Sequence, residues 1–171
     1  RKKKALREEL QKKQELMIAK ISKKKLPLTP EEYGKYYKIC DSLPFAFTDI
    51  EMVFNEEKKA VDWIFRYGNE ALATLEKLPL DKMIGNSFSS LFSNMDAKWL
   101  HVYERATLYG ETLEIMDYSP EIDTNLKIIC FPTFPGHCGC ILFNADQMKS
   151  ISEENHLVRL AAVALKSNPT I

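Results

Sequence analysis

An alternating run of apolar and polar residues in the first half of the chain constrains the fold more than any other feature. In the segment 61–67 every second position is apolar, and these positions are Val61, Trp63, Phe65 and Tyr67. A period of two is typical of a half-buried strand. The segment 45–54 before it is apolar and rich in strand-forming residues, and the run 55–59 between them is polar. The sequence therefore predicts an antiparallel β-hairpin.

Helix signals fill the stretch after this hairpin. Asn69 is suited to cap a short helix over 70–77. The segment 96–109 carries apolar residues at spacings of three and four, which are Trp99, Leu100, Tyr103, Ala106 and Thr107. Gly110 stands where a glycine commonly ends a helix. One face of this longer helix is therefore expected to pack on a core.

Three more strands are predicted after the helices, over 111–118, 125–134 and 137–143, and a final helix over 152–167. Strands on both sides of a block of helices are typical of an α+β fold. We expect a five-stranded antiparallel sheet with helices on one face, plus N-terminal and C-terminal helices. The order does not fit a Rossmann fold, because that fold alternates strand with helix and carries a glycine fingerprint.

Residues 1–25 form a basic leader. They hold 11 basic and 3 acidic residues, whereas the rest of the chain holds 13 basic and 21 acidic residues, so the formal net charge of zero divides into +8 and −8. The leader has no Gly or Pro, which favours a helix, and Leu10, Met17 and Ile21 fit a short coiled-coil seam. Such a basic helix is suited to nucleic acid or anionic lipid. Because it has no aromatic residue to stack on bases, we expect a solvated helix and no nucleic acid.

The proline-containing stretch 26–30 separates the leader from a second predicted helix over 30–43. We expect an N-terminal helical leader over 1–43, a central domain over 44–146 and a C-terminal helical linker over 147–171. No apolar run approaches the roughly 18 residues of a membrane span. The chain begins without Met, so we expect a piece of a longer protein. Four cysteines without a secretory signal favour reduced thiols in the cytoplasm.

Several short motifs between Leu43 and Asp146 follow one another in a recognisable order. They are Asp62-Trp63-Ile64-Phe65-Arg66-Tyr67 running into Gly68-Asn69-Glu70-Ala71-Leu72, then Met83-Ile84-Gly85-Asn86-Ser87-Phe88, Leu91-Phe92, the helix that ends at Tyr109-Gly110, and Ile141-Leu142-Phe143-Asn144-Ala145-Asp146. In this order they resemble a PAS domain. PAS domains of this kind occur in large bacterial signalling proteins, often beside diguanylate cyclase or kinase domains. The resemblance thus implies a linked output domain, and a role in sensing a small ligand, light, redox state or oxygen, or in dimerisation, among which the fold does not choose.

Two cofactor classes of that family are not expected here. Its flavin photosensors carry a Gly-x-x-Cys motif, but Gly85 is followed by Phe88 at the position of the thiol, which argues against cysteinyl–flavin photochemistry. Haem binding needs an axial His on the long helix. His101 lies about 200° around that helix from both Trp99 and Tyr103, so it is predicted to point outward, which argues against haem. The cofactor, if there is one, stays unknown.

Four potential metal ligands lie near the last predicted turn. Cys130, His137, Cys138 and Cys140 invite comparison with a zinc site. If that turn has two residues, Cys130 lies opposite Ile141 and on the other face from Cys138 and Cys140. Four ligands cannot converge from such positions, so we expect small packing residues and no metal.

Two functions from different classes follow, and neither is enzymatic, since the chain has no phosphate-binding glycine loop, nucleophile elbow or His-Glu-x-x-His pair. The first is a sensor whose apolar cavity takes its lining from Trp63, Phe65, Phe88, Phe92, Trp99, Tyr103, Tyr118 and Phe131. For any one of these residues an ordinary core role is the stronger expectation. The second is a ligand-free homodimer that relays signals through Leu10, Met17, Ile21, Leu157, Leu160 and Leu165. A lined cavity favours the sensor, and a filled interior favours the relay.

Overall fold

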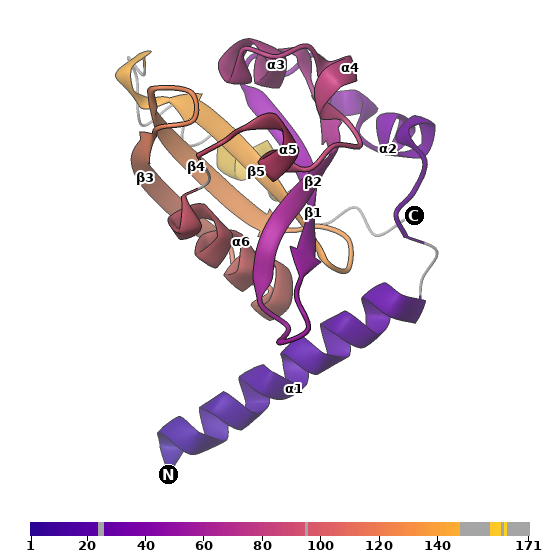
Figure 1. Cartoon of the computed structure of the whole chain (residues 1–171), viewed down its shortest axis with the longest axis vertical. Helices are drawn as coiled ribbons and strands as arrows, with labels where there is room; N and C mark the ends of the chain where they lie inside the picture. The colour runs from indigo at the N-terminus through magenta and orange to yellow at the C-terminus, as the bar shows by residue number, and fades with distance from the viewer. Residues whose placement is uncertain (24–25, 95, 148–157, 162, 164–171) are drawn as a thin grey trace.

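The computed structural model describes residues 1–23, 26–94, 96–147, 158–161 and 163 (Figure 1). Its helices are α1 (Lys2–Lys23), α2 (Pro30–Tyr36), η1 (Lys38–Cys40), α3 (Glu70–Glu76), α4 (Leu80–Met83), α5 (Phe88–Leu91), α6 (Ala97–Tyr109) and η2 (Ala145–Gln147). Its strands are β1 (Ala46–Phe54), β2 (Ala60–Gly68), β3 (Leu113–Ser119), β4 (Thr124–Pro132) and β5 (His137–Asn144).

The five strands form one sheet in the order β2-β1-β5-β4-β3, and every neighbouring pair is antiparallel. The first and last strands therefore lie side by side at its centre. The helices from α3 to α6 come between β2 and β3 in the chain, and α5 and α6 lie over one face of the sheet (Figure 1). We call this the near face and the opposite side the far face. The predicted α+β fold is confirmed.

The hairpin of β1 and β2 is less regular than its alternation predicts. The pairing shifts between Asp49 and Ile50 and again between Val53 and Phe54. Each irregularity turns the strand that follows it to the other face. Only the middle of the run, Trp63 and Phe65, therefore joins the near-face core. Val61 is 44% exposed, and Tyr67 packs on the far face.

The long helix α6 has the predicted bounds because both of its ends are capped. The Asp96 side chain accepts a hydrogen bond from the Lys98 backbone at 3.0 Å. Gly110 has a φ of 68°, a left-handed conformation that glycine adopts without strain. Trp99 and Tyr103 from this helix are buried against the sheet. The prediction of a core-facing helix is confirmed.

The helix that begins at Pro30 packs on the far face of the sheet. Its start is a capping box, in which Thr29 Oγ1 accepts from the Glu32 backbone at 3.2 Å and Glu32 Oε1 accepts from the Thr29 backbone at 3.0 Å. The α-helix ends at Tyr36, well before the predicted Leu43, and a 3₁₀ turn follows. Tyr33 and Tyr37 are fully buried against far-face strands. The segment 30–40 is therefore part of the folded body.

The leader is helical as predicted, and α1 contacts α6. Figure 1 shows α1 passing the tip of the β1–β2 hairpin. Leu10 is half-buried there, in a shallow groove with Lys58 and Tyr109. In the part of the chain that the structure describes, no helix is both long and apolar enough to cross a membrane.

Candidate functional site

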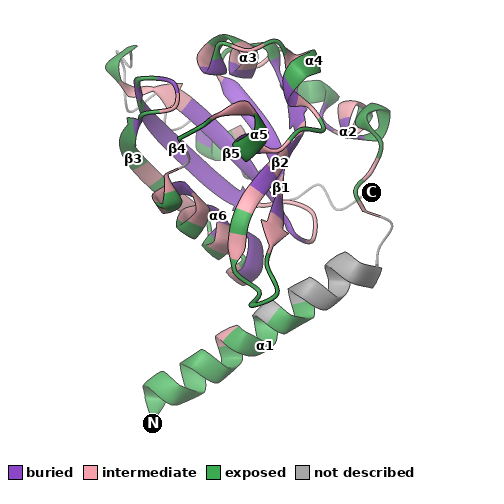
Figure 2. Cartoon of the chain, viewed as in Figure 1, coloured by how far each residue is buried: buried purple, intermediate pink, exposed green. Residues whose placement is uncertain are grey.

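Six of the eight aromatic residues predicted to line a cavity meet in one cluster on the near face. They are Trp63, Phe65, Phe88, Phe92, Trp99 and Tyr103. The strand β2 supplies the first two, the short helix α5 and its end supply the next two, and α6 supplies the last two. Figure 2 shows the buried strands that lie behind these helices. Sequence spacing thus identified residues that the fold brings together.

The rings of this cluster contact one another directly. Ring centroids are 4.2 Å apart for Trp63 and Phe88, 4.6 Å for Phe88 and Phe92, and 5.0 Å for Trp63 and Tyr103. The first separation lies just below the range of about 4.5–7 Å for interacting aromatic pairs, and the other two lie at its short end. A ligand between these three pairs would have to push the rings apart. That the six residues line a ligand pocket stays a prediction.

The other two predicted lining residues, Tyr118 and Phe131, lie elsewhere. Tyr118 is on the edge strand β3, is 42% exposed, and donates a hydrogen bond to Asp123. Phe131 is fully buried, but on the far face, where its ring stacks on Phe47 at 6.4 Å. Strand residues alternate between faces, and because Cys130 points to the near face, Phe131 points away. Placing Phe131 with the near-face aromatics was therefore wrong.

The three cysteines of β4 and β5 share the near face. Cys130 pairs with Cys140, and Cys138 lies two residues along the same strand, so the prediction that Cys130 faces away from them was wrong. Pro132 pairs with Cys138, so the connection between β4 and β5 is longer than the two-residue turn that we assumed. The register of β4 is therefore shifted by one residue, and such a shift moves Cys130 to the other face of the sheet. Burial raises the pKa of the Cys130 and Cys140 thiols, which keeps them protonated. Among the described residues no group of three or more His, Cys, Asp or Glu is arranged to hold a metal ion.

Two positions that bear on cofactors lie as the spacing predicts. Phe88 is 5% exposed and its ring fills the core, at the position where a flavin photosensor needs a thiol. His101 is exposed on α6, whereas Trp99 and Tyr103 are buried. An axial haem ligand on this helix would have to face the core, so the geometry offers no such ligand at His101.

The far face carries a buried polar cluster that the sequence analysis missed. It consists of Tyr33 and Tyr37 from the α2 segment, Asp49 from β1, Thr133, and His137 from β5. The Tyr33 hydroxyl lies 2.8 Å from His137 Nε2, and His137 Nδ1 lies 3.0 Å from the Pro135 carbonyl. Because a carbonyl only accepts, Nδ1 carries the proton, and in the neutral ring Nε2 accepts from Tyr33.

Asp49 is the centre of this cluster. Its Oδ2 accepts hydrogen bonds from the Tyr37 hydroxyl and, at 2.9 Å, from Thr133 Oγ1. Its Oδ1 is buried and has no hydrogen-bond partner among the described residues. Burial raises the pKa of the Asp49 carboxyl to about 6, and nearby Glu51 adds to the rise, whereas His137, Tyr37 and Thr133 oppose it.

A sequence signal for this cluster exists. Asp49 is a charged residue inside an apolar strand, and such a position requires either a bend to solvent or buried partners. Tyr33 and Tyr37 are four residues apart, which places them on one side of a helical turn. The partners come from segments far apart in the chain, so spacing alone does not connect them.

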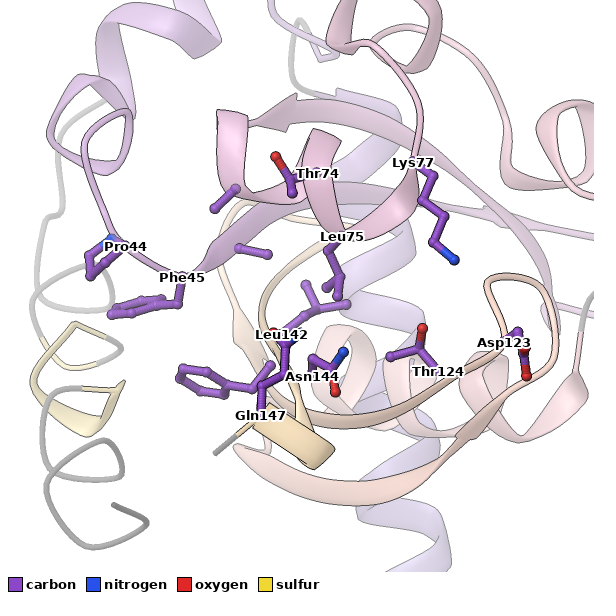
Figure 3. A pocket seen from close by; sticks show the side chains of 13 residues that line it. Pro44, Phe45, Thr74, Leu75, Lys77, Asp123, Thr124, Leu142, Asn144 and Gln147 are labelled. Atoms are coloured by element: carbon purple, nitrogen blue, oxygen red, sulfur yellow. The ribbon is translucent and has the colours of Figure 1, made fainter. Parts of the chain in front are cut away.

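A separate surface pocket of about 750 Å³ lies between α3 and the ends of β1 and β5 (Figure 3). Leu75, Leu142 and Phe45 give it apolar walls, while Lys77 and Asn144 add polar groups. None of the eight predicted lining residues borders it.

The predicted dimer residues are described in part. Leu160 is 54% exposed, and its neighbour Val158 is fully buried in the far-face core. Leu10 is half-buried. Met17 and Ile21 belong to α1, but their side chains, like Leu157 and Leu165, lie outside the described residues. The dimer hypothesis thus stays a prediction.

A scan against models of protein families finds no match, and neither does a search of curated proteins. Among solved structures, the chain is similar to the LOV protein of Rhodobacter sphaeroides, with a TM-score of 0.55 and 13% identity over 82% of this chain and 84% of that one. It is also similar to a PAS domain of an HTR-like protein from Haloarcula marismortui, with a TM-score of 0.45 and 8% identity over 67% and 92% of the two chains. An RNA-binding light-oxygen-voltage receptor matches with a TM-score of 0.41 and 16% identity over 81% and 39%. Because the Rhodobacter match covers 82% of this chain and 84% of that one, the chain has the PAS-like fold that its motifs predict.

Proposed function

We propose that this chain is a regulatory domain of a bacterial signal-transduction protein, which relays signals through its flanking helices to a linked output domain and catalyses no reaction itself. The observation that carries this proposal is the set of ring contacts by which Trp63 of β2 joins Phe88 of α5 and Tyr103 of α6. Densely packed interiors transmit displacements because they have no free volume to absorb them. A shift of α6 would therefore move the sheet, and the reverse.

The contact between α1 and α6 gives this coupling a route out of the domain. The route requires a partner for the apolar stripe of α1, and we propose that the partner is a second copy of this chain. Exposed Leu160, near the other end of the chain, supports a second contact of the same kind. Burial of leucine and isoleucine side chains between helices is the usual driving force of such dimers.

Sedimentation velocity of the 171-residue chain over a range of concentrations tests this proposal. We expect a dimer that dissociates in the double variant Met17→Glu and Ile21→Glu, since charged side chains would face each other in the seam. Leu16→Glu is the matched control, because Leu16 is on the same helix, is 57% exposed and lies off the stripe. A wild-type chain that stays monomeric at every concentration would refute dimer-based relay.

The surface pocket favours a second candidate function, the binding of a small ligand. Its volume of about 750 Å³ lies within the roughly 300–1,000 Å³ that is typical of ligand sites. Apolar walls with a few polar groups, such as Lys77 and Asn144, suit an amphiphilic molecule (Figure 3). Native mass spectrometry and thermal-shift screening test this candidate. A stabilising compound whose effect is lost in Leu75→Trp, which fills the pocket, supports it, and the absence of any bound or stabilising compound argues against it.

A further inference from the structure

The segment 30–40 is attached to the far face through two tyrosine hydroxyls that reach buried titratable groups. Tyr33 is 2.8 Å from His137 Nε2, and Tyr37 donates to Asp49. Both rings are buried in the far-face core, where the Tyr37 centroid lies 5.2 Å from that of Phe47. A helix of only seven residues is marginal by itself, so these contacts decide whether it stays on the sheet.

The charge state of Asp49 is the variable part of this attachment. One oxygen accepts from Tyr37 and Thr133, and the other has no hydrogen-bond partner among the described residues. An ionised carboxylate with an unsatisfied oxygen is unfavourable in a buried site, whereas a protonated carboxyl tolerates the site better.

The surrounding groups offset a negative charge on Asp49 only in part, since burial outweighs His137 and the two hydroxyl donors, which lower its pKa, and Glu51 adds to the rise. The titratable or charged side chains around it, from the segment 30–40, β1, β2 and β5, are Tyr33, Tyr36, Tyr37, Glu51, Arg66, Tyr67, His137 and Cys140. Arg66 is paired with Glu51 at 2.9 Å, and the negative charge of Glu51 repels an ionised Asp49. His137 directs Nε2 to Tyr33 and lies 3.6 Å from Glu51 Oε2.

We propose that the interface between the segment 30–40 and the sheet is a proton-controlled latch, in which protonated Asp49 holds the segment on the far face and ionised Asp49 releases it. The inference rests on the proposed function in one respect, since this segment leads to α1, one of the relay helices. Through the latch, the signal that the domain reads includes the proton concentration around it.

The direction of the pH dependence follows from linkage. Burial raises the pKa of Asp49 from its ordinary 3.8 to about 6, and release of the segment returns it towards 3.8 because water then reaches the carboxyl. The docked state therefore binds the proton more strongly than the released state. Docking is strongest below about pH 4, weakens as the pH rises through about 6, and then levels off. Linkage limits the change in the docking equilibrium to about tenfold per pH unit.

Hydrogen–deuterium exchange of the full chain between pH 4.5 and pH 8, read by mass spectrometry, tests the latch. Peptides from 30–40 report docking, and peptides from α6 provide an internal reference on the other face, which cancels the intrinsic pH dependence of exchange. We expect the protection of 30–40 relative to α6 to fall severalfold up to about pH 6.5 and then stay constant. In Asp49→Asn, which keeps the shape but does not titrate, the relative protection should not change with pH.

Tyr37→Phe is the second variant and guards against a folding defect in Asp49→Asn. It removes one donor to the ionised carboxylate, so the midpoint of the transition should move to higher pH. The latch is overturned if the wild-type ratio does not vary with pH, or if Asp49→Asn keeps the wild-type variation. Neither result depends on the sedimentation measurement, so the latch and the relay proposal fail separately.

Discussion

The two faces of the sheet are stabilised by different physics. The near face is covered by α5 and α6, and its core is a set of aromatic rings in mutual contact. The far face is covered by the segment 30–40, and its centre is the buried Asp49 carboxyl in a cluster with four hydroxyl- or imidazole-bearing residues, Tyr33, Tyr37, Thr133 and His137. Apolar burial is non-directional and depends on volume. The contribution of a buried polar group to stability depends on its hydrogen-bond partners and on its protonation state. Substitutions should therefore act through volume on the near face and through hydrogen bonds, charge and close contacts elsewhere.

The largest expected effect is the loss of a near-face ring. Phe88→Ala should reduce the free energy of unfolding by about 3–5 kcal/mol, because it leaves a cavity between Trp63 and Phe92 that the surrounding rings cannot fill. Urea denaturation followed by tryptophan fluorescence measures this change. Tyr118→Ala is the matched control, an aromatic residue that is 42% exposed, and should cost much less. Equal losses in the two variants would mean that the near-face rings are not a packed unit.

The second effect concerns the residue that connects the two faces. Asn69 accepts hydrogen bonds from the backbones of Phe47 and Leu72 at 3.1 and 3.0 Å, and donates to the carbonyls of Cys40 and Phe45, both at 3.0 Å. It thereby links η1, β1 and α3. Asn69→Ala should lower the free energy of unfolding by about 2–4 kcal/mol, since several buried groups lose their partners.

Asn125→Ala provides the control for that measurement, because Asn125 is exposed and its side chain bonds the exposed Asp146 side chain, at 3.3–3.4 Å. Little change is expected there. Thermal denaturation of both variants, monitored by circular dichroism, gives the comparison. If Asn69→Ala melts at the wild-type temperature, the polar link between the faces contributes nothing to stability.

The sequence predicts the near face well and the far face poorly. Helical spacing in 96–109 places Trp99 and Tyr103 on one side of a helix, and period two in β2 places Trp63 with Phe65. Such local periodicities survive folding because each lies within one element. Cys130 and Phe131 were misplaced because the facing of β4 depends on the length of the connection to β5, which the pattern Pro135-Gly136 does not determine.

The far-face cluster depends on contacts between distant segments. Tyr33 and His137 are separated by 104 positions in the chain, and Asp49 and Thr133 by 84. An unexplained charge in an apolar strand indicates that partners exist but does not identify them. The irregularity opposite Asp49 and Ile50, where Arg66 of β2 is the extra residue, turns Tyr67 to the far face and is likewise not predicted by strict alternation.

The third effect is a pH dependence of stability caused by Glu76, a second buried carboxyl group, which lies in α3. Burial raises the pKa of Glu76 to about 7, and the negative charge of Glu121 adds to the rise. A raised pKa in the folded state adds stability below the unfolded value of 4.5, and this stability is lost as the pH rises through about 7. Glu76→Gln should therefore be more stable than wild type by about 2–3 kcal/mol at pH 8 and similar to it near pH 4.

Urea denaturation at pH 4, 6 and 8 provides that comparison. Glu70→Gln is the control on the same helix, because Glu70 is exposed and should leave the pH dependence as in wild type. The raised pKa of Asp49 also lowers stability as the pH rises. The informative quantity is therefore the difference in unfolding free energy between wild type and Glu76→Gln at each pH. A difference that does not vary with pH would show that the pKa of Glu76 is the same in the folded and unfolded states.

The smallest effects come from two glycines on the far side, and they should have opposite signs. A Cβ added at Gly139 would lie 2.8 Å from Phe131 Cζ, so Gly139→Ala should destabilise the protein by about 1–3 kcal/mol as the ring is displaced. A Cβ at Gly34 in α2 meets nothing within 4 Å, so Gly34→Ala should add about 0.5–1 kcal/mol through helix propensity. Urea denaturation of the two variants gives both values. Losses in both would mean that helix propensity at Gly34 does not limit stability. Opposite signs would show that Gly139 lies in a tightly packed strand and that Gly34 lies on an open side of α2.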